Sequence, residues 1–234
     1  LYQHYMKKAD GLVFQTKEAA DYYANKYSGI STIIYNPLSL NNFPEIYHGK
    51  REKVIVNVGR LHYQKNQKLL INAFKRVHDK YPEYSLEIYG EGELRGNLEN
   101  YISSLKLNQS VKLMGNRSDV LECERKKSIF VLSSDFEGMP NALIEAMALG
   151  IPVVSTDCPC GGPRELIEDH VNGSLVPVGN IDKLEEAIIE LIENEELFRL
   201  YCNNEVEIRD RLNEQKIMKQ WLDFCNDIVE RNNL

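Results

Sequence analysis

The sequence predicts an α/β protein with a doubly wound, Rossmann-like parallel sheet. Short β-branched, apolar segments alternate with segments of helical periodicity from residue 53 to residue 178. This alternation is typical of βαβ units, and right-handed crossovers between such units place helices on both faces of one sheet. The chain has 234 residues, 43% of them hydrophobic. That is enough for a sizeable core, in one large domain or two small ones.

The strands expected in this sheet are 53–59, 84–90, 110–115, 128–134, 151–157 and 174–178. The helices expected between them are 67–81, 93–107, 141–150 and 164–170, followed by a helical pattern from Ile181 almost to the end. In the first helix Leu69, Leu70, Ala73, Phe74 and Val77 share one face, and Pro82 ends it. Ligands of such folds bind at the carboxyl ends of the strands.

The first forty residues differ from the rest. Segments 9–16, 17–27 and 31–38 predict a strand, a helix and a strand, and a polar linker broken by Pro44 and Gly49 follows. We therefore expect three parts. Residues 1–40 are a remnant of another lobe with its linker, 41–213 are the domain with the large sheet, and 214–234 are a C-terminal helix.

Composition narrows the classes of function. The net charge of −7 and the pI of about 5.4 argue against nucleic acid as a partner. No apolar run is long enough to span a bilayer, and no signal peptide is visible. The five cysteines are odd in number and irregularly spaced, which favours a reducing cytoplasm over a disulfide framework. Cys158 and Cys160 form a Cys-x-Cys pair without a second cluster nearby, so we expect no metal site.

The segment "FEGMPNALIEAMALG" places two glutamates around the start of a helix. Pro140 suits the first helical position. The backbone N–H groups that follow, together with the helix dipole, form an anion site suited to phosphate. Glu145 leans back toward the same cleft, where its carboxylate can accept two hydrogen bonds from a ribose diol. Glu137, before the helix, could accept bonds from sugar hydroxyls, so the arrangement fits a nucleotide sugar.

A plainer interpretation makes Glu137 a solvated loop residue and Glu145 a surface residue of the helix. Against it, Glu145 stands among Leu143, Ile144, Ala146 and Met147. A charge in such an apolar helix normally needs a partner.

Two further segments follow strand ends. Arg60 and Lys65 lie just past the first strand, where Gly59 allows close approach of a ligand to the backbone. Two cations at this place would neutralise a diphosphate, and the alternative is a solvated basic loop. The glycines of "YGEGEL", residues 89–94, follow the second strand but are too few for a dinucleotide fingerprint.

Together these segments resemble the C-terminal, donor-binding lobe of the retaining GT-B glycosyltransferases of family 4, also called group 1. "VGRLHYQKN" is similar to the family's Gly-Arg-Leu segment with its following Lys, and "IYGEGELRGNLE" to its glycine turn. "FEGMPNALIEAMALGIPVVSTD" is similar to its Glu-x7-Glu motif, and "GPRELIEDHVNGSLVPVGN" to the segment after it. The resemblance covers most of the chain, and the four segments are specific only in combination.

The resemblance implies roles for individual residues. Arg60 and Lys65 would bind the donor diphosphate and stabilise the leaving nucleotide, Glu145 would bind the ribose, and Glu137 would contact the donor sugar. Backbone N–H groups of residues 141–143 would hold phosphate oxygens, and the base would rest near 90–92 and 114–116. Catalytic roles fall to Arg60, Lys65 and Glu137. The implied donor-binding set is Gly59, Arg60, Lys65, Gly90, Gly92, Gly115, Asn116, Glu137, Gly138, Asn141, Ala142, Leu143 and Glu145.

The resemblance also implies the reaction. A retaining, metal-independent transferase without a cofactor would move a hexose or N-acetylhexosamine from a nucleotide-diphosphate sugar, with uridine diphosphate favoured. The acceptor would be a saccharide or a lipid-linked group in bacterial surface polysaccharide synthesis, a class that "TDCPCGGPRELI" resembles. The alternatives are a GT-B-type nucleotide-sugar epimerase and a non-catalytic nucleotide-binding module.

The same resemblance makes the first 27 residues the last strand and helix of the N-terminal, acceptor-binding lobe. We therefore expect a fragment that is inactive in transfer on its own, with the nucleotide sugar and the missing lobe as its partners. A cytoplasmic location is expected, with association to the inner face of the membrane through that lobe. The stripe of the last helix, formed by Ile217, Trp221, Phe224, Cys225 and Ile228, packs either on the first lobe or on its own domain.

Overall fold

A computed structural model describes residues 8–27, 29–41, 43–203 and 205–232. Its main domain is a six-stranded sheet in the order β5-β4-β3-β6-β7-β8, with every neighbouring pair parallel. The strands are β3 (Glu52–Val58), β4 (Ser85–Tyr89), β5 (Val111–Gly115), β6 (Lys127–Leu132), β7 (Val153–Thr156) and β8 (Ser174–Val176). The order runs outward from β3 in one direction and from β6 in the other. The topological switch point, where ligands of such sheets bind, therefore lies between β3 and β6.

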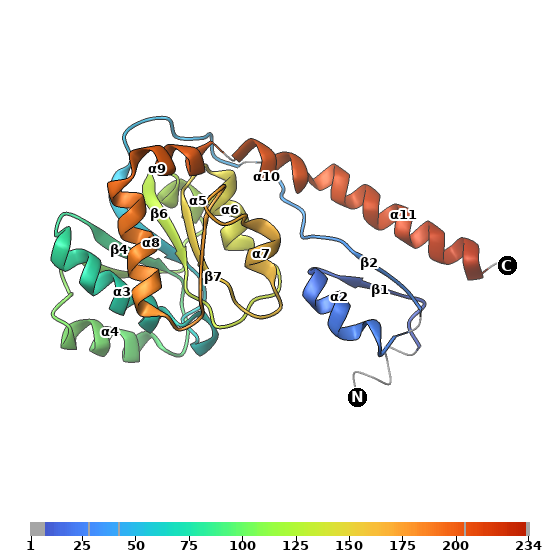
Figure 1. Ribbon diagram of the computed structural model, residues 1–234, viewed down its shortest axis with the longest axis horizontal. Helices are drawn as coiled ribbons and strands as arrows, with labels where there is room; N and C mark the ends of the chain where they lie inside the picture. Colours follow the sequence, from blue (N-terminus) through green and yellow to red (C-terminus); the bar gives the residue numbers. More distant parts are fainter. Residues whose placement is uncertain (1–7, 28, 42, 204, 233–234) are drawn as a thin grey trace.

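Helices cover both faces of the sheet, as the doubly wound class requires (Figure 1). Helices α3, α4, α8 and α9 pack over one face, and α5, α6, α7 and α10 over the other. Their bounds are α3 (Gln67–Lys80), α4 (Arg95–Ser104), α5 (Val120–Glu124), α6 (Asn141–Ala148), α7 (Gly162–Leu166), α8 (Ile181–Glu193), α9 (Glu195–Cys202) and α10 (Glu205–Arg211).

Helix α3 shows how the sequence produces these elements. Asn66 caps it by accepting a hydrogen bond from the Leu69 N–H, in a left-handed conformation that asparagine tolerates. The five apolar residues predicted to share one face are all buried against the sheet. The helix ends at Lys80, two residues before Pro82, because the residue before a proline is disfavoured in the helical region.

Two short helices on the other face differ from the prediction. The helix expected over 164–170 spans Gly162–Leu166 instead. Gly161 takes a left-handed conformation there and Pro163 occupies the first turn, so the helix starts early, and it ends where Ile167 is extended. Helix α5 was not predicted, because five residues are too few to show helical periodicity.

A second, smaller unit precedes the main domain. Strands β1 (Gly11–Phe14) and β2 (Ile30–Ile33) form a two-stranded parallel sheet, joined by helix α2 (Lys17–Ala24). The C-terminal helix α11 (Glu214–Asn232) leaves the main domain and runs toward this unit (Figure 1). Ile34, Ile217 and Phe224 form a small core there, against which Val13, Ile30 and Ile228 pack. Of the two alternatives, packing on the first unit is therefore the one observed for Ile217, Phe224 and Ile228. Trp221 and Cys225, also predicted in the stripe, are exposed and lie outside this core.

The smaller unit also contacts the main domain directly. The Glu165 carboxylate accepts hydrogen bonds from the Lys17 N–H and the Tyr35 hydroxyl, both at 2.7 Å. The chain passes from one unit to the other twice. The two connecting segments meet where the Leu38 N–H donates to the Leu212 carbonyl at 2.7 Å. None of the helices in the described ranges combines the length and the apolar character that a membrane crossing needs.

Candidate functional site

Two loops meet at the switch point of the sheet. One follows β3 and contains the short 3-10 helix η1 (Tyr63–Lys65), and the other follows β6. The Ser133 hydroxyl donates to the Lys65 carbonyl at 2.9 Å, and the Asn66 amide donates to Asp135 at 2.7 Å. These bonds fix the first loop on the second, and so bring together motifs that are about seventy residues apart in the sequence.

Lys65 and Glu137 form an ion pair across these two loops. The Lys65 ammonium lies 2.5 Å from Oε1 of Glu137, and the Ser134 hydroxyl donates to the same oxygen at 2.6 Å. Glu137 and Ser134 are buried. The prediction gave Lys65 to the diphosphate and Glu137 to the sugar, and the structure places them in direct contact. No described residue bonds to the second carboxylate oxygen, which can therefore accept a hydrogen bond from a ligand.

Arg60 is an exposed cation of this site. It lies two residues after the end of β3, and its carbonyl accepts a hydrogen bond from the Gln67 side-chain amide at 2.9 Å. No carboxylate in the described part of the chain pairs with its guanidinium. Arg60 thus offers an uncompensated positive charge at the mouth of the sheet, as a phosphate-binding role requires.

A hollow of about 330 Å³ opens beside Arg60 at the ends of β3, β4 and β5. Its lining is Val58, Gly59, Arg60, Tyr89, Gly90, Glu91, Asn116, Arg117 and Val120. Gly90 has φ +135°, and a Cβ there would lie 2.1 Å from the Gly59 carbonyl oxygen. Only glycine therefore lets these two turns approach each other. Gly90 and Asn116, predicted near the base, line this hollow together with Gly59, which was predicted to allow close approach of a ligand.

Two glycines of the donor-binding set that were predicted near the base do not line this hollow, and two residues that line it were not predicted. Gly92 and Gly115 are not among the lining residues. A side chain at Gly92 would meet the Leu61 backbone, and the Gly115 carbonyl accepts from the Gly90 N–H at 2.9 Å, so both serve backbone packing. Glu91 and Arg117 line the hollow but were not predicted. Their position in the same turns, next to the glycines, was the available signal.

The start of α6 departs from the prediction in two details. Pro140 is the N-cap residue, with φ −80° and ψ 100°, and the helix begins at Asn141. The Pro140 carbonyl accepts from the N–H groups of Leu143 at 3.1 Å and Ile144 at 3.2 Å. The Leu143 N–H is thus already used and is not available to a phosphate. Within the described ranges the N–H groups of Asn141 and Ala142 have no acceptor, as expected for the first turn.

Glycines also bring the loop before α6 against α7. A Cβ at Gly162 would lie 1.5 Å from the Gly138 carbonyl oxygen. Gly138 belongs to the predicted set, and its loop is further held where the Glu137 N–H donates to the Pro159 carbonyl at 3.2 Å. The loop that carries Glu137 is therefore seated on the segment 159–162.

Glu145 lies in α6 and is partly buried, and this burial raises the pKa of its carboxyl. No hydrogen bond or ion pair joins its carboxylate to another described residue. At the end of α5, burial raises the pKa of Glu124 well above its usual range, and the charge of Glu145 raises it further. Sequence analysis missed Glu124, because a glutamate within the charged run "ECERKK" gives no motif signal.

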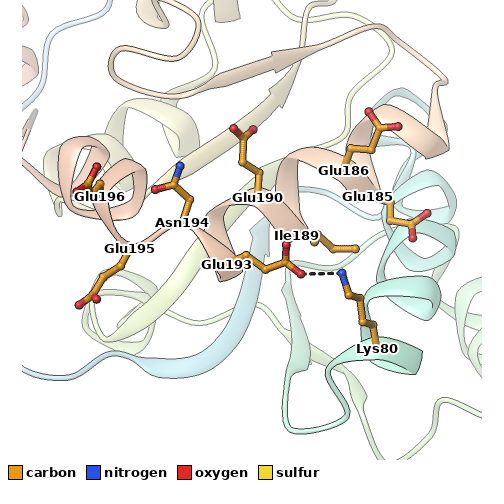
Figure 2. A pocket seen from close by; sticks show the side chains of 9 residues that line it. All are labelled: Lys80, Glu185, Glu186, Ile189, Glu190, Glu193, Asn194, Glu195 and Glu196. Atoms are coloured by element: carbon orange, nitrogen blue, oxygen red, sulfur yellow. Dashed lines mark hydrogen bonds and ion pairs between the residues drawn. The ribbon is translucent and has the colours of Figure 1, made fainter.

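A larger groove lies away from this cluster and carries the wrong charge for a nucleotide (Figure 2). Its volume is about 610 Å³, and its lining is Lys80, Glu185, Glu186, Ile189, Glu190, Glu193, Asn194, Glu195 and Glu196. Lys80, the cation in this lining, lies 2.6 Å from Glu193 and is neutralised by it. A surface this acidic repels phosphates. The switch point therefore remains the candidate site.

The parallel sheet, with helices on both faces and a switch point between β3 and β6, places the chain in the class of Rossmann-type α/β domains. The chain belongs to the family described as "Glycosyl transferases group 1", whose model matches residues 40–214. This match confirms the resemblance stated from the sequence.

Individual relatives agree with the family. The uncharacterized glycosyltransferase MJ1059 of Methanocaldococcus jannaschii is 31% identical over 94% of this chain and 64% of its own length. The amylovoran biosynthesis glycosyltransferase AmsD of Erwinia amylovora is 28% identical over 93% of this chain and 62% of its own length. A crystal structure of a variant of S. aureus TarM superposes with a TM-score of 0.86 at 24% identity, over 95% of this chain and 45% of TarM.

These matches have two consequences. The TarM superposition confirms the fold as one lobe of the GT-B class. The chain spans less than two thirds of the length of each of these three proteins.

Proposed function

We propose that this chain is the donor-binding part of a retaining, metal-independent glycosyltransferase. The donor is a nucleotide-diphosphate sugar, with uridine diphosphate favoured, and the transferred group is a hexose or an N-acetylhexosamine. The acceptor is a saccharide or a lipid-linked group in bacterial surface polysaccharide synthesis. The observation that carries the proposal is the meeting of Arg60, the Lys65–Glu137 pair and the α6 start at the switch point.

Each part of this cluster suits one part of the donor. The Arg60 guanidinium and the Lys65 ammonium neutralise the diphosphate and stabilise the charge that develops on it as the sugar leaves. The free N–H groups of Asn141 and Ala142 hold phosphate oxygens. The hollow beside Gly90 receives the base, and Glu145 accepts from the ribose diol. Glu137, fixed by Lys65, turns its second oxygen to the sugar.

The relatives support the choice of donor and pathway. The name of AmsD assigns it to amylovoran biosynthesis, and the TarM crystal contains uridine diphosphate. As part of the proposal we assign to this chain bacterial surface polysaccharide synthesis, a uridine-diphosphate donor, and a cytoplasmic location at the inner face of the membrane.

We also propose the division of the chain into 1–40, 41–213 and 214–234, with the first part completing an acceptor lobe that the remaining length of the protein supplies. The packing of α11 on the β1–β2 unit supports this division.

Calorimetric titration with uridine diphosphate tests the phosphate site. The wild-type chain should bind it, and Arg60→Ala should weaken binding by about 1.5–3 kcal/mol, the range for hydrogen bonds to charged groups. Arg199→Ala removes an exposed arginine on α9, away from the candidate site, and should leave the affinity unchanged. Equal affinities for Arg60→Ala and wild type would show that the diphosphate does not bind here.

The same titration tests the ribose site. Glu145→Gln keeps the shape of the side chain but removes its charge. It should therefore cut the affinity for uridine diphosphate more than the affinity for the 2′-deoxy analogue, which lacks one of the two hydroxyls. Equal losses for the two ligands would give Glu145 a structural role.

A further inference from the structure

The first residue of α3 carries a buried amide that is only half satisfied. Gln67 is 1% exposed. Its side-chain N–H donates to the Arg60 carbonyl at 2.9 Å, whereas its side-chain oxygen has no hydrogen-bond partner among the described residues. Leaving a buried oxygen unpaired costs at least as much as one hydrogen bond typically gains. Gln67 therefore adds little to the stability of the fold, and its bond to Arg60 needs another explanation.

The bond from Gln67 acts on a peptide group that is also held at its other end. The carbonyl of Arg60 and the N–H of Leu61 belong to this one peptide group. The Leu61 N–H donates to the Glu91 carbonyl at 2.9 Å, in the loop after β4. The peptide plane is thus fixed from α3 on one side and from the β4 loop on the other. A fixed plane limits the direction in which the Arg60 side chain leaves the backbone.

The Arg60 side chain itself is restrained much less. It is exposed, and no carboxylate in the described part of the chain pairs with its guanidinium. A free arginine side chain loses conformational entropy when it binds a ligand, and this loss weakens the binding. A backbone that is already held in place reduces the freedom that binding must remove. The bond from Gln67 to Arg60 supplies such a hold directly at the residue proposed to meet the diphosphate.

We propose that Gln67 is a positioning residue, which holds the backbone of Arg60 so that the guanidinium is directed toward the donor diphosphate. This inference rests on the proposed function, because it assumes a diphosphate that Arg60 binds. Gln67 is buried and acts only through Arg60. Its effect is therefore confined to the phosphate part of the ligand and requires the Arg60 side chain.

Two substitutions remove the bond in different ways. Gln67→Met keeps the length of the side chain but removes both the donor and the unpaired oxygen. Gln67→Asn keeps the amide but is too short to reach the Arg60 carbonyl. Gln220→Met is the matched control, because it makes the same exchange at an exposed glutamine of α11. Calorimetry measures the affinity for uridine diphosphate, and an NMR titration measures the affinity for uridine, which has no phosphate.

Gln67→Met should lower the affinity for uridine diphosphate by about twofold to tenfold, the effect of one hydrogen bond, and leave the affinity for uridine unchanged. Its melting temperature should equal or exceed that of the wild type, because the unpaired oxygen is gone. Gln67→Asn should give the same pattern of affinities, and Gln220→Met should bind as the wild type does. Wild-type affinity for uridine diphosphate in both Gln67 variants would overturn the proposal. An equal loss for the two ligands would also overturn it, because a purely structural role predicts that result.

A double-mutant cycle tests whether Gln67 acts through Arg60. In the Arg60→Ala chain the guanidinium is absent, so adding Gln67→Met should not weaken the binding of uridine diphosphate further. A loss as large as the one in the wild-type background would show that Gln67 acts independently of Arg60, and the proposal would be wrong.

Hydrogen exchange provides a readout without nucleotide. Gln67→Met should speed the exchange of the Leu61 amide hydrogen, because release of the Arg60 carbonyl loosens the peptide group that the two residues share. Unchanged exchange would show that Gln67 does not hold Arg60. If the wild type bound no uridine diphosphate, the proposed function would fall and the role toward the diphosphate with it. Binding by the wild type with no loss in the Gln67 variants would instead refute this inference alone.

Discussion

Lys65 and Glu137 show at the scale of single residues how one pair can serve both stability and binding. The carboxylate is buried, and its charge is tolerated because an ammonium and a hydroxyl face it. The same ammonium stands at the switch point, where a diphosphate would meet it. Under the proposed function either residue therefore has two roles, and a substitution must be tested for both.

Lys65→Ala should destabilise the fold as well as weaken nucleotide binding. It leaves Glu137 buried without a cation, which costs about 3 kcal/mol, the lower end for a broken interior pair. Urea unfolding measures this loss, and Lys65→Ala combined with Glu137→Gln should recover most of it. Arg60→Ala, at an exposed position without a described partner, should unfold at the wild-type concentration of urea. Wild-type stability of Lys65→Ala would mean that the pair contributes nothing to folding.

The motifs singled out candidate site residues, but not how these residues contact each other. Arg60, Lys65, Glu137 and Glu145 all carry signals in the sequence, because they follow strand ends or interrupt an apolar helix. The contact between Lys65 and Glu137 depends on the strand order, which places β3 beside β6. Glu124 has no signal, since only the tertiary structure makes it differ from the exposed Glu122.

At the scale of elements, the loop before α6 depends on a backbone contact that only glycine permits. The Gly138 carbonyl occupies the space of a Cβ at Gly162. This contact seats the loop of Glu137 on the start of α7. The positions of the Glu137 loop and of α7 relative to the site therefore depend on the absence of a side chain at Gly162.

Gly162→Ala should destabilise the protein by about 2 kcal/mol or more, because the backbone must move to relieve the overlap. Gly96→Ala is its control, since a Cβ at Gly96 meets no atom within 4 Å and Gly96 lies in the first turn of α4. That substitution should stabilise by at most about 0.5 kcal/mol, the lower end of the gain of alanine over glycine in the middle of a helix. Thermal unfolding measures both, and a neutral Gly162→Ala would show that the loop repacks without cost.

The strands and α3 were predictable, whereas the shortest helices were not. The buried face of α3 has a helical period, and β3 is a continuous apolar run, so both have a signal in the sequence. Helix α5 and the early start of α7 depend on a few turn residues, and such boundaries are fixed by local backbone geometry. The helical stripe of α11 was visible, but periodicity does not say which surface a stripe covers.

At the scale of the whole molecule, the smaller unit depends on α11 for its core. Phe224 is 9% exposed and packs with Ile34 and Ile217, whereas Leu222 on the same helix is 61% exposed. Phe224→Ala should cost about 3 kcal/mol, and Leu222→Ala should cost less than about 0.5 kcal/mol. Hydrogen exchange of the β1 and β2 amides measures the loss locally. Unchanged protection in Phe224→Ala would show that α11 does not support this unit.

The double crossing between the two units has a mechanical consequence. A single tether would let the smaller unit rotate freely about it, whereas two adjacent tethers resist torsion and permit bending mainly about the line that joins them. The hydrogen bond from the Leu38 N–H to the Leu212 carbonyl joins the two tethers. At another point of contact between the units, Glu165 accepts hydrogen bonds from Lys17 and Tyr35. A swing of the smaller unit about this double tether would therefore break the contacts of Glu165 with Lys17 and Tyr35. Because Glu165 belongs to α7, which the Gly138 contact joins to the loop of Glu137, that swing also pulls on the loop that carries Glu137.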